Sequence, residues 1–182
     1  MMRPAKPLMI LFLLLLVVSC WQLSSARPAN PPAAGKTVVL KAADVTSKIF
    51  PESVFYHGQV APVQMRNTGG VHFADDLYVL AGLVDNSGYS TATREKYQGY
   101  LLTEVPLQIG GETLKPGAYG FGFLEGSKFL VTDLGGNDVL QVAGQRDAEL
   151  KHPVPLEVLA AADGNGYRLY KGREYVTFTR AK

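Results

Sequence analysis

The sequence predicts an all-β fold, an antiparallel meander of about ten short strands that forms a flattened barrel or, alternatively, a β-sandwich. Short apolar runs alternate with glycine-containing turns, most clearly between Tyr97 and Ala143. No window between Gly35 and Lys182 keeps an apolar i, i+3, i+4 pattern without Gly, Pro or β-branched interruption, so we expect no helix longer than two turns there. The consecutive hairpins favour an up-and-down strand order and hence the barrel.

The N-terminal segment has the pattern of a secretory signal. Arg3 and Lys6 give a basic start, Leu8–Val18 is an apolar run of 11 residues, and the small residues Ser24-Ser25-Ala26 follow. The apolar run is shorter than the roughly 20 residues that a transmembrane helix needs. We therefore predict that residues 1–26 are a signal peptide, that the mature chain begins at Arg27, and that the protein is periplasmic or secreted.

An alternative processing site lies at Cys20. The sequence Val17-Val18-Ser19-Cys20 is similar to the lipobox of bacterial lipoproteins, in which the cysteine becomes the lipidated first residue. The bulky Trp21 after the cysteine is unusual for that class. Lipidation of Cys20 would make the protein a membrane-anchored lipoprotein, and a membrane contact is expected only under this alternative, through that lipid anchor.

The rest of the chain is predicted to be a Pro- and Ala-rich spacer over residues 27–35 and a single β domain over residues 36–182. Removing Arg3 and Lys6 from the 18 basic residues leaves 16, against 16 acidic residues. Because nucleic-acid binding needs a clustered excess of Lys and Arg, we expect no nucleic-acid partner. Cys20 is the only cysteine, so core packing rather than an internal disulfide must stabilise the domain.

The strands are assigned in order from β-branched and apolar runs. They are expected at Thr37–Lys41, Ser53–Gln64 (interrupted at Gly58 or Pro62), Leu77–Val84, Leu107–Ile109, Glu112–Leu114, Ala118–Leu124, Val154–Ala162, Tyr167–Lys171 and Arg173–Arg180. Leu77–Val84 is apolar throughout, which predicts a central strand. Pro62 lacks an N–H donor, which indicates an edge strand. Asp85–Lys96 is the longest polar stretch and is expected to be a loop, either a solvated hairpin extension or a functional rim.

Three turns follow from glycine and proline. Gly110-Gly111 predicts a two-residue hairpin loop, Lys115-Pro116-Gly117 predicts a type II turn, and Asn67–Gly70 is expected to turn the chain as well. The segment Leu114–Tyr119 is similar to a turn found in several families of small secreted β-sandwich domains. This similarity favours the sandwich alternative.

Catalytic and metal-binding motifs are missing from the sequence. His57, His72 and His152 are far apart and form no His-Glu-x-x-His motif, and Gly88-Tyr89-Ser90 lacks the closing glycine of a nucleophile elbow. In Asp133–Asp138, an Asx-stabilised hairpin turn is preferred over a calcium site. We therefore expect a protein that is not an enzyme and binds no cofactor or metal. A hydrolase that uses Asp133 or Asp138 is the alternative.

Aromatic residues and glycines of the central meander are the candidate ligand-binding residues. One face of Ala118–Leu124 carries aromatic rings and the other is nearly bare backbone, which is typical of a bend or of close approach by another segment or a ligand. The candidates are Tyr97, Tyr100, Tyr119, Gly120, Phe121, Gly122 and Phe123. They would line a barrel mouth or a concave sheet, and the alternative is that the aromatic residues are ordinary core residues. We predict a binding module for a small apolar or carbohydrate ligand. The alternative is a structural or assembly partner that pairs with an envelope protein through an edge strand.

Overall fold

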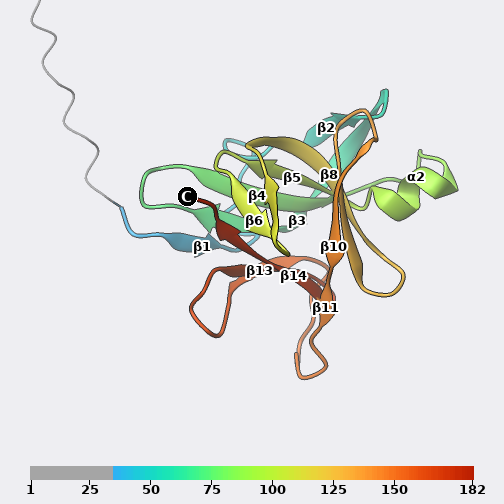
Figure 1. Cartoon of the computed structure of the whole chain (residues 1–182). Helices are drawn as coiled ribbons and strands as arrows, with labels where there is room; N and C mark the ends of the chain where they lie inside the picture. The colour runs from blue at the N-terminus through green and yellow to red at the C-terminus, as the bar shows by residue number, and fades with distance from the viewer. Residues whose placement is uncertain (1–34) are drawn as a thin grey trace, which may run out of the picture. The chain divides into compact units, whose positions relative to one another are not determined.

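The computed structural model describes residues 35–182, so the predicted signal peptide, Cys20 and residues 27–34 of the spacer lie outside the described residues. The strands form two antiparallel sheets (Figure 1). The eight-stranded sheet has the order β1 (Val38–Leu40), β3 (Gln59–His72), β4 (Tyr78–Val84), β5 (Gly99–Thr103), β8 (Gly117–Leu124), β9 (Lys128–Thr132) and β10 (Asp138–Ala143), with β2 (Ser53–Tyr56) paired to β3. The six-stranded sheet has the order β12 (Glu157–Ala160), β13 (Tyr167–Lys171), β14 (Glu174–Arg180), β6 (Leu107–Ile109) and β7 (Glu112–Leu114), with β11 (Gln145–Arg146) paired to β14.

The two sheets share one apolar core. Phe121 and Phe129 of the eight-stranded sheet and Phe178 of the six-stranded sheet belong to the same buried cluster. The all-β prediction is therefore confirmed, in the sandwich-like arrangement that was its alternative. The strands of residues 35–182 do not close into the flattened barrel that the hairpin order favoured.

The central meander is interrupted by a change of sheet. After β5 the chain forms the β6–β7 hairpin in the six-stranded sheet, and it then returns to place β8 beside β5. Gly110 (φ 57°) and Gly111 (φ 93°) form the predicted two-residue loop of this hairpin. The predicted type II turn at Lys115–Gly117 is wrong, because Gly117 does not have the positive φ that this turn requires and instead begins β8 opposite Thr103.

The predicted turn at Asn67–Gly70 is also wrong, because these residues continue β3. Gly70 pairs with Leu40 on one side and with Leu80 on the other. A Cβ at Gly70 would overlap the carbonyl oxygen of Val79. The glycine pair is therefore needed for close packing within the sheet, a requirement that resembles a turn signal in the sequence.

The segment Ser53–Gln64 forms a hairpin rather than one interrupted strand. His57 (φ 46°) and Gly58 (φ 81°) form a two-residue turn between β2 and β3. Pro62 pairs with Ser53 of β2, and its carbonyl oxygen accepts a hydrogen bond from the Asp85 N–H. The outer strand at this position is therefore β2, whereas the predicted central strand Leu77–Val84 is confirmed by β4, which lies between β3 and β5.

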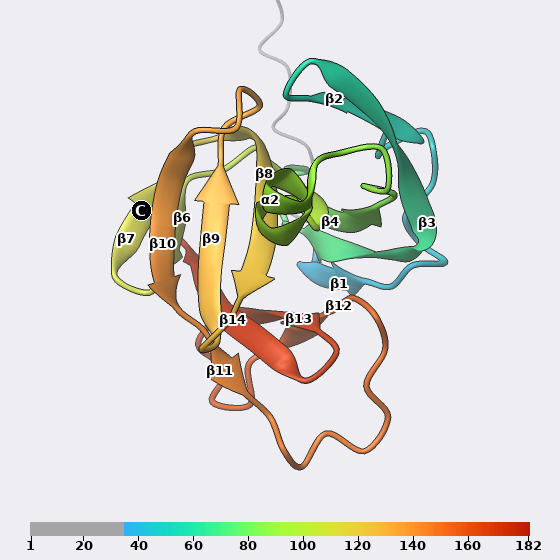
Figure 2. The ribbon, with the colours of Figure 1, turned by 90° about the vertical axis from the view of Figure 1, so that its right-hand side faces the viewer.

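The predicted loop Asp85–Lys96 contains a short helix, α2 (Thr91–Lys96). The Ser90 side chain caps it by accepting a hydrogen bond from the Thr93 N–H (3.3 Å). With six residues, α2 stays within the predicted limit of two turns. Figure 2 shows α2 in front of β8, on the face of the eight-stranded sheet that points away from the other sheet.

Candidate functional site

Strand β8 carries five of the seven predicted ligand-binding residues and places its aromatic side chains and its two glycines on opposite faces. Phe121 and Phe123 are buried between the two sheets, and Phe121 lies 5.8 Å from the Phe129 ring, centroid to centroid. Tyr119 is half-buried against the same core, and its hydroxyl donates to the carbonyl oxygen of Lys115 (3.0 Å). These three aromatic residues share one face, as predicted, and that face is the interior of the sandwich.

Tyr97 and Tyr100 belong to a second buried cluster, under the β2–β3 hairpin on the outer face of the eight-stranded sheet. The Tyr97 ring is stacked on Tyr56 at 3.6 Å between centroids. The Tyr56 hydroxyl forms a 2.8 Å hydrogen bond with the Thr132 hydroxyl. Burial raises the pKa of both Tyr56 and Tyr97, so both phenols stay protonated. The seven candidate residues are therefore divided between two cores and do not converge on one pocket.

Gly120 and Gly122 do not face open space. An ideal Cβ at Gly120 would lie 2.6 Å from Cε2 of Tyr56 and 2.7 Å from Oγ1 of Thr132. At Gly122 it would lie 2.5 Å from the carbonyl oxygen of Lys96, at the end of α2. The face of β8 that carries Gly120 and Gly122 is therefore covered by other segments of the chain. These segments fill the space in which a ligand was expected.

The acidic turn Asp133–Asp138 has the Asx geometry that was preferred for it. The Asp133 carboxylate accepts hydrogen bonds of 2.9 Å from both the backbone N–H and the side-chain amide of Asn137. These bonds lower the pKa of Asp133. Asp138 forms an ion pair with Lys96 (2.8 Å). Among residues 35–182 there is no group of three or more His, Cys, Asp or Glu side chains that could hold a metal ion.

The three histidines lie in different parts of the fold. His72 Nε2 lies 2.7 Å from a carboxylate oxygen of Asp76, and its ring is stacked on Tyr78 at 4.2 Å. His57 occupies the β2–β3 turn, close to Gly136 of the β9–β10 turn. His152 lies in the loop before β12.

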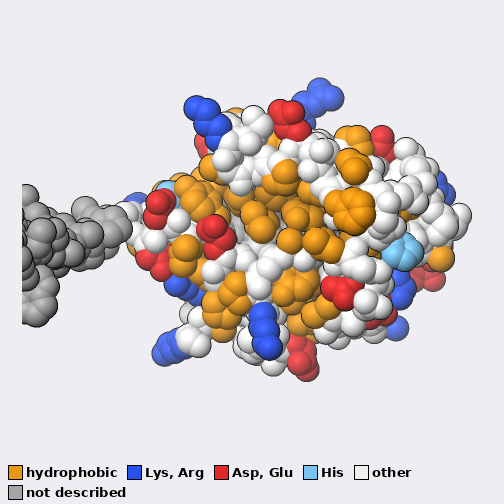
Figure 3. Space-filling view, turned by 90° about the horizontal axis from the view of Figure 1, so that it is seen from above, with side chains coloured by type: hydrophobic (Ala, Val, Ile, Leu, Met, Phe, Trp, Pro, Cys, Tyr) orange, Lys and Arg blue, Asp and Glu red, His pale blue; other side chains and the backbone are white. Residues whose placement is uncertain are grey.

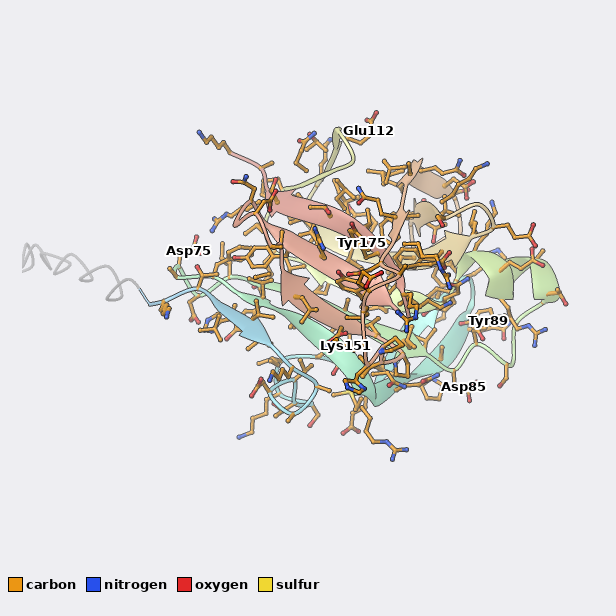
Figure 4. The ribbon with its side chains drawn as sticks, turned by 90° about the horizontal axis from the view of Figure 1, so that it is seen from below. Asp75, Asp85, Tyr89, Glu112, Lys151 and Tyr175 are labelled. Atoms are coloured by element: carbon orange, nitrogen blue, oxygen red, sulfur yellow. The ribbon has the colours of Figure 1, made fainter. Side chains whose placement is uncertain are left out.

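An apolar groove lies where an edge strand of the eight-stranded sheet approaches an edge strand of the six-stranded sheet. It runs between β1 and β12, has a volume of about 580 Å³, and is lined by residues of β1, β3 and β12 together with the segments that flank them. Figure 4 shows this side of the molecule, with Lys151 on the loop that leads into β12 and Tyr175 over the six-stranded sheet. The lining residues are Val39–Ala42, Arg66–Thr68 and Val154–Ala160.

Most of the groove lining is aliphatic. Leu156 and Val158 are buried, whereas Val154 is 40% exposed at the surface. Among the lining residues that the structure describes there is no aromatic side chain. The volume lies within the range of about 300–1,000 Å³ that small-molecule sites occupy. The groove can therefore take an elongated aliphatic group, but it offers no ring on which a sugar would stack.

The charged residues of the groove are Lys41, Arg66 and Glu157. Burial raises the pKa of Glu157, and the nearby charge of Lys41 partly opposes this shift. Sequence reasoning missed this site because its β12 part lies more than 80 residues along the chain from its β1 and β3 parts. The apolar run at Val154–Ala162 was recognised as a strand, but nothing in the sequence indicated that it would lie beside β1.

The geometry defines the protein as a two-sheet, sandwich-like all-β domain with an apolar groove between sheet edges. Comparison of the chain with models of known protein families, with curated proteins and with solved structures found no match. No helix among the described residues is long and apolar enough to cross a membrane.

Proposed function

We propose that the protein is a non-enzymatic binding module outside the cytoplasm that holds a small apolar ligand in the groove between β1 and β12. The groove itself is the observation that carries this proposal, because it has the volume of a small-molecule site and a mostly aliphatic lining. The proposed location rests on the signal-like segment before residue 27, and lipidation at Cys20 would hold the module at a membrane.

Filling the groove tests this function. Ala160 is an exposed lining residue, so a Trp side chain there would occupy ligand volume without entering the core. We expect Ala160→Trp to weaken binding of Nile red, a neutral apolar fluorescent probe, by about tenfold or more. Ala143→Trp is the matched control, because Ala143 is also exposed on a strand but lies outside the groove. Equal Nile red affinity of the two folded variants would reject the groove as the site.

A second candidate function, assembly with an envelope protein through an edge strand, is favoured by the β2–β3 hairpin. Phe55 (58% exposed) and Val60 (65% exposed) are directly opposite each other on its outer side. Among the strands of residues 35–182, β2 pairs only with β3, so one edge of β2 has no described strand beside it. Figure 3 shows hydrophobic side chains gathered over the middle of the face seen from above. An exposed apolar pair beside a free edge is typical of strand addition.

This second function predicts that Phe55→Asp removes a stoichiometric partner from pull-downs of envelope extracts. Val139→Asp is the control, since Val139 is 48% exposed but lies on β10. A partner that both variants retain would place the contact elsewhere.

A further inference from the structure

The groove has two chemically different ends. Leu40, Gly69 and Val158 converge near its middle, because an ideal Cβ at Gly69 would lie 3.4 Å from the Leu40 carbonyl oxygen and 3.1 Å from the Val158 nitrogen. Lys41 follows Leu40 in the chain, and its charge is close enough to Glu157 to act on the Glu157 pKa, so both lie on the same side of this point. Arg66, which precedes Gly69 on β3, lies on that side too, because β1 and β3 are antiparallel. Val39 and Ala160 lie toward the other, uncharged end.

The charged end has an excess of positive charge. Within residues 35–182 the ion pairs are Lys96–Asp138 and Arg180–Asp75, and Asp76 is hydrogen-bonded to His72, so neither Lys41 nor Arg66 has a carboxylate partner there. Glu157 is the acidic lining residue, and it offsets one of the two cations. The nearby Asp44 carboxylate accepts the Lys41 backbone N–H (2.9 Å) and so belongs to its own turn. The lining therefore leaves one positive charge beside an aliphatic groove.

We propose that the ligand is a long-chain carboxylic acid whose acyl chain lies along β12 and whose carboxylate reaches Lys41 and Arg66. This inference rests on the proposed function of the groove. A carboxylate brings one negative charge, which matches the net charge of the lining, and a guanidinium and an ammonium are the side chains that hold carboxylates best. From there the acyl chain runs toward Val39 and Ala160 at the uncharged end, where burial of exposed apolar area is favourable.

Competition between a charged and an uncharged ligand of the same chain tests this proposal. The full-length protein is first saturated with cis-parinaric acid, a fluorescent long-chain acid, and is then titrated with oleic acid or with oleyl alcohol. We expect oleic acid to displace the probe at about tenfold lower concentration than the alcohol. In Lys41→Gln/Arg66→Gln this advantage should disappear, because the acid loses the partners of its carboxylate. Lys115→Gln/Arg146→Gln, which removes the same charge from exposed positions outside the groove, should behave as the original chain.

The outcomes separate the inference from the function on which it rests. If the acid and the alcohol compete equally in the original chain, or if the Lys41/Arg66 variant keeps the preference for the acid, the carboxylate site is wrong while the apolar groove stands. If neither compound binds, the proposed function fails as well. A preference for the acid that the Lys115/Arg146 control also loses would reflect overall charge and would overturn the assignment to Lys41 and Arg66.

Discussion

The hydroxyl pair of Tyr56 and Thr132 is a buried polar contact between the β2–β3 hairpin and β9. Thr132→Val keeps the shape of the side chain but leaves the Tyr56 hydroxyl without this partner. We expect a loss of about 1–3 kcal/mol in the free energy of unfolding, the cost of an unsatisfied buried polar group. Urea denaturation of the two proteins measures it.

A double-mutant cycle provides the control for this bond. Tyr56→Phe combined with Thr132→Val removes both hydroxyls, so no polar group is left unsatisfied and the double variant should be more stable than Thr132→Val alone. If the two substitutions are simply additive, the bond contributes nothing.

Gly122 tests the close approach of α2 to β8. A methyl group at this position would displace the Lys96 carbonyl, so Gly122→Ala should destabilise the protein by about 1–3 kcal/mol. Gly88→Ala is the matched control, because the nearest atom to its ideal Cβ, a Gln59 side-chain oxygen, is 3.8 Å away. Urea midpoints compare the two. A Gly122→Ala protein that is as stable as Gly88→Ala but has lost ligand binding would restore Gly122 as a ligand contact.

At the scale of elements, a surface ion pair joins the two sheets. Arg180 of β14 contacts the Asp75 carboxylate, in the β3–β4 turn, through hydrogen bonds of 2.8 and 2.9 Å. The Arg180 guanidinium lowers the pKa of Asp75. Because the folded-state pKa is depressed, the stabilisation is present above the unfolded value of about 3.9 and is lost as the pH falls through the folded-state value.

Asp75→Asn should therefore lower the urea midpoint at neutral pH, and the difference from the original chain should vanish in strong acid. The effect is small because both side chains are substantially exposed. Glu125→Gln, at an exposed position without a side-chain hydrogen bond in the described part of the chain, controls for the change in net charge. A difference that persists in acid would show that the ion pair is not its cause.

Elements that are determined locally were predictable from the sequence. The Gly110-Gly111 hairpin, the Asp133 turn and the central strand β4 all depend on residues that are close together in the chain. Gly69 and Gly70 were misread as a turn because the reason for them, close packing against Val158 and Val79, comes from distant strands. Helix α2 was missed because it is short and has no fully buried residue, so it has no apolar periodicity to detect.

At the scale of the whole molecule, the candidate site was not predictable. The groove needs β1, β3 and β12 to meet, and this meeting depends on how two sheets are packed rather than on any local pattern. The aromatic candidates stood out because aromatic residues are conspicuous in a sequence, yet Tyr97, Phe121 and Phe123 are buried in the two cores. The ligand site proposed here is instead aliphatic, and aliphatic lining residues resemble ordinary strand residues.

The shared core predicts that the two sheets unfold together. Phe121 is completely buried between them, and its ring fills the space that a Cβ at Gly99 would overlap. Phe121→Ala should cost about 3–5 kcal/mol, because it leaves a cavity that both sheets line. Phe55→Ala deletes the same atoms from an exposed strand position and should change stability by only about 0.5 kcal/mol. Urea unfolding can be monitored by far-ultraviolet circular dichroism and by tyrosine fluorescence. The two probes should give one coincident transition, which Phe121→Ala shifts as a whole. Two separate transitions, with only one displaced, would mean that the sheets are stabilised independently.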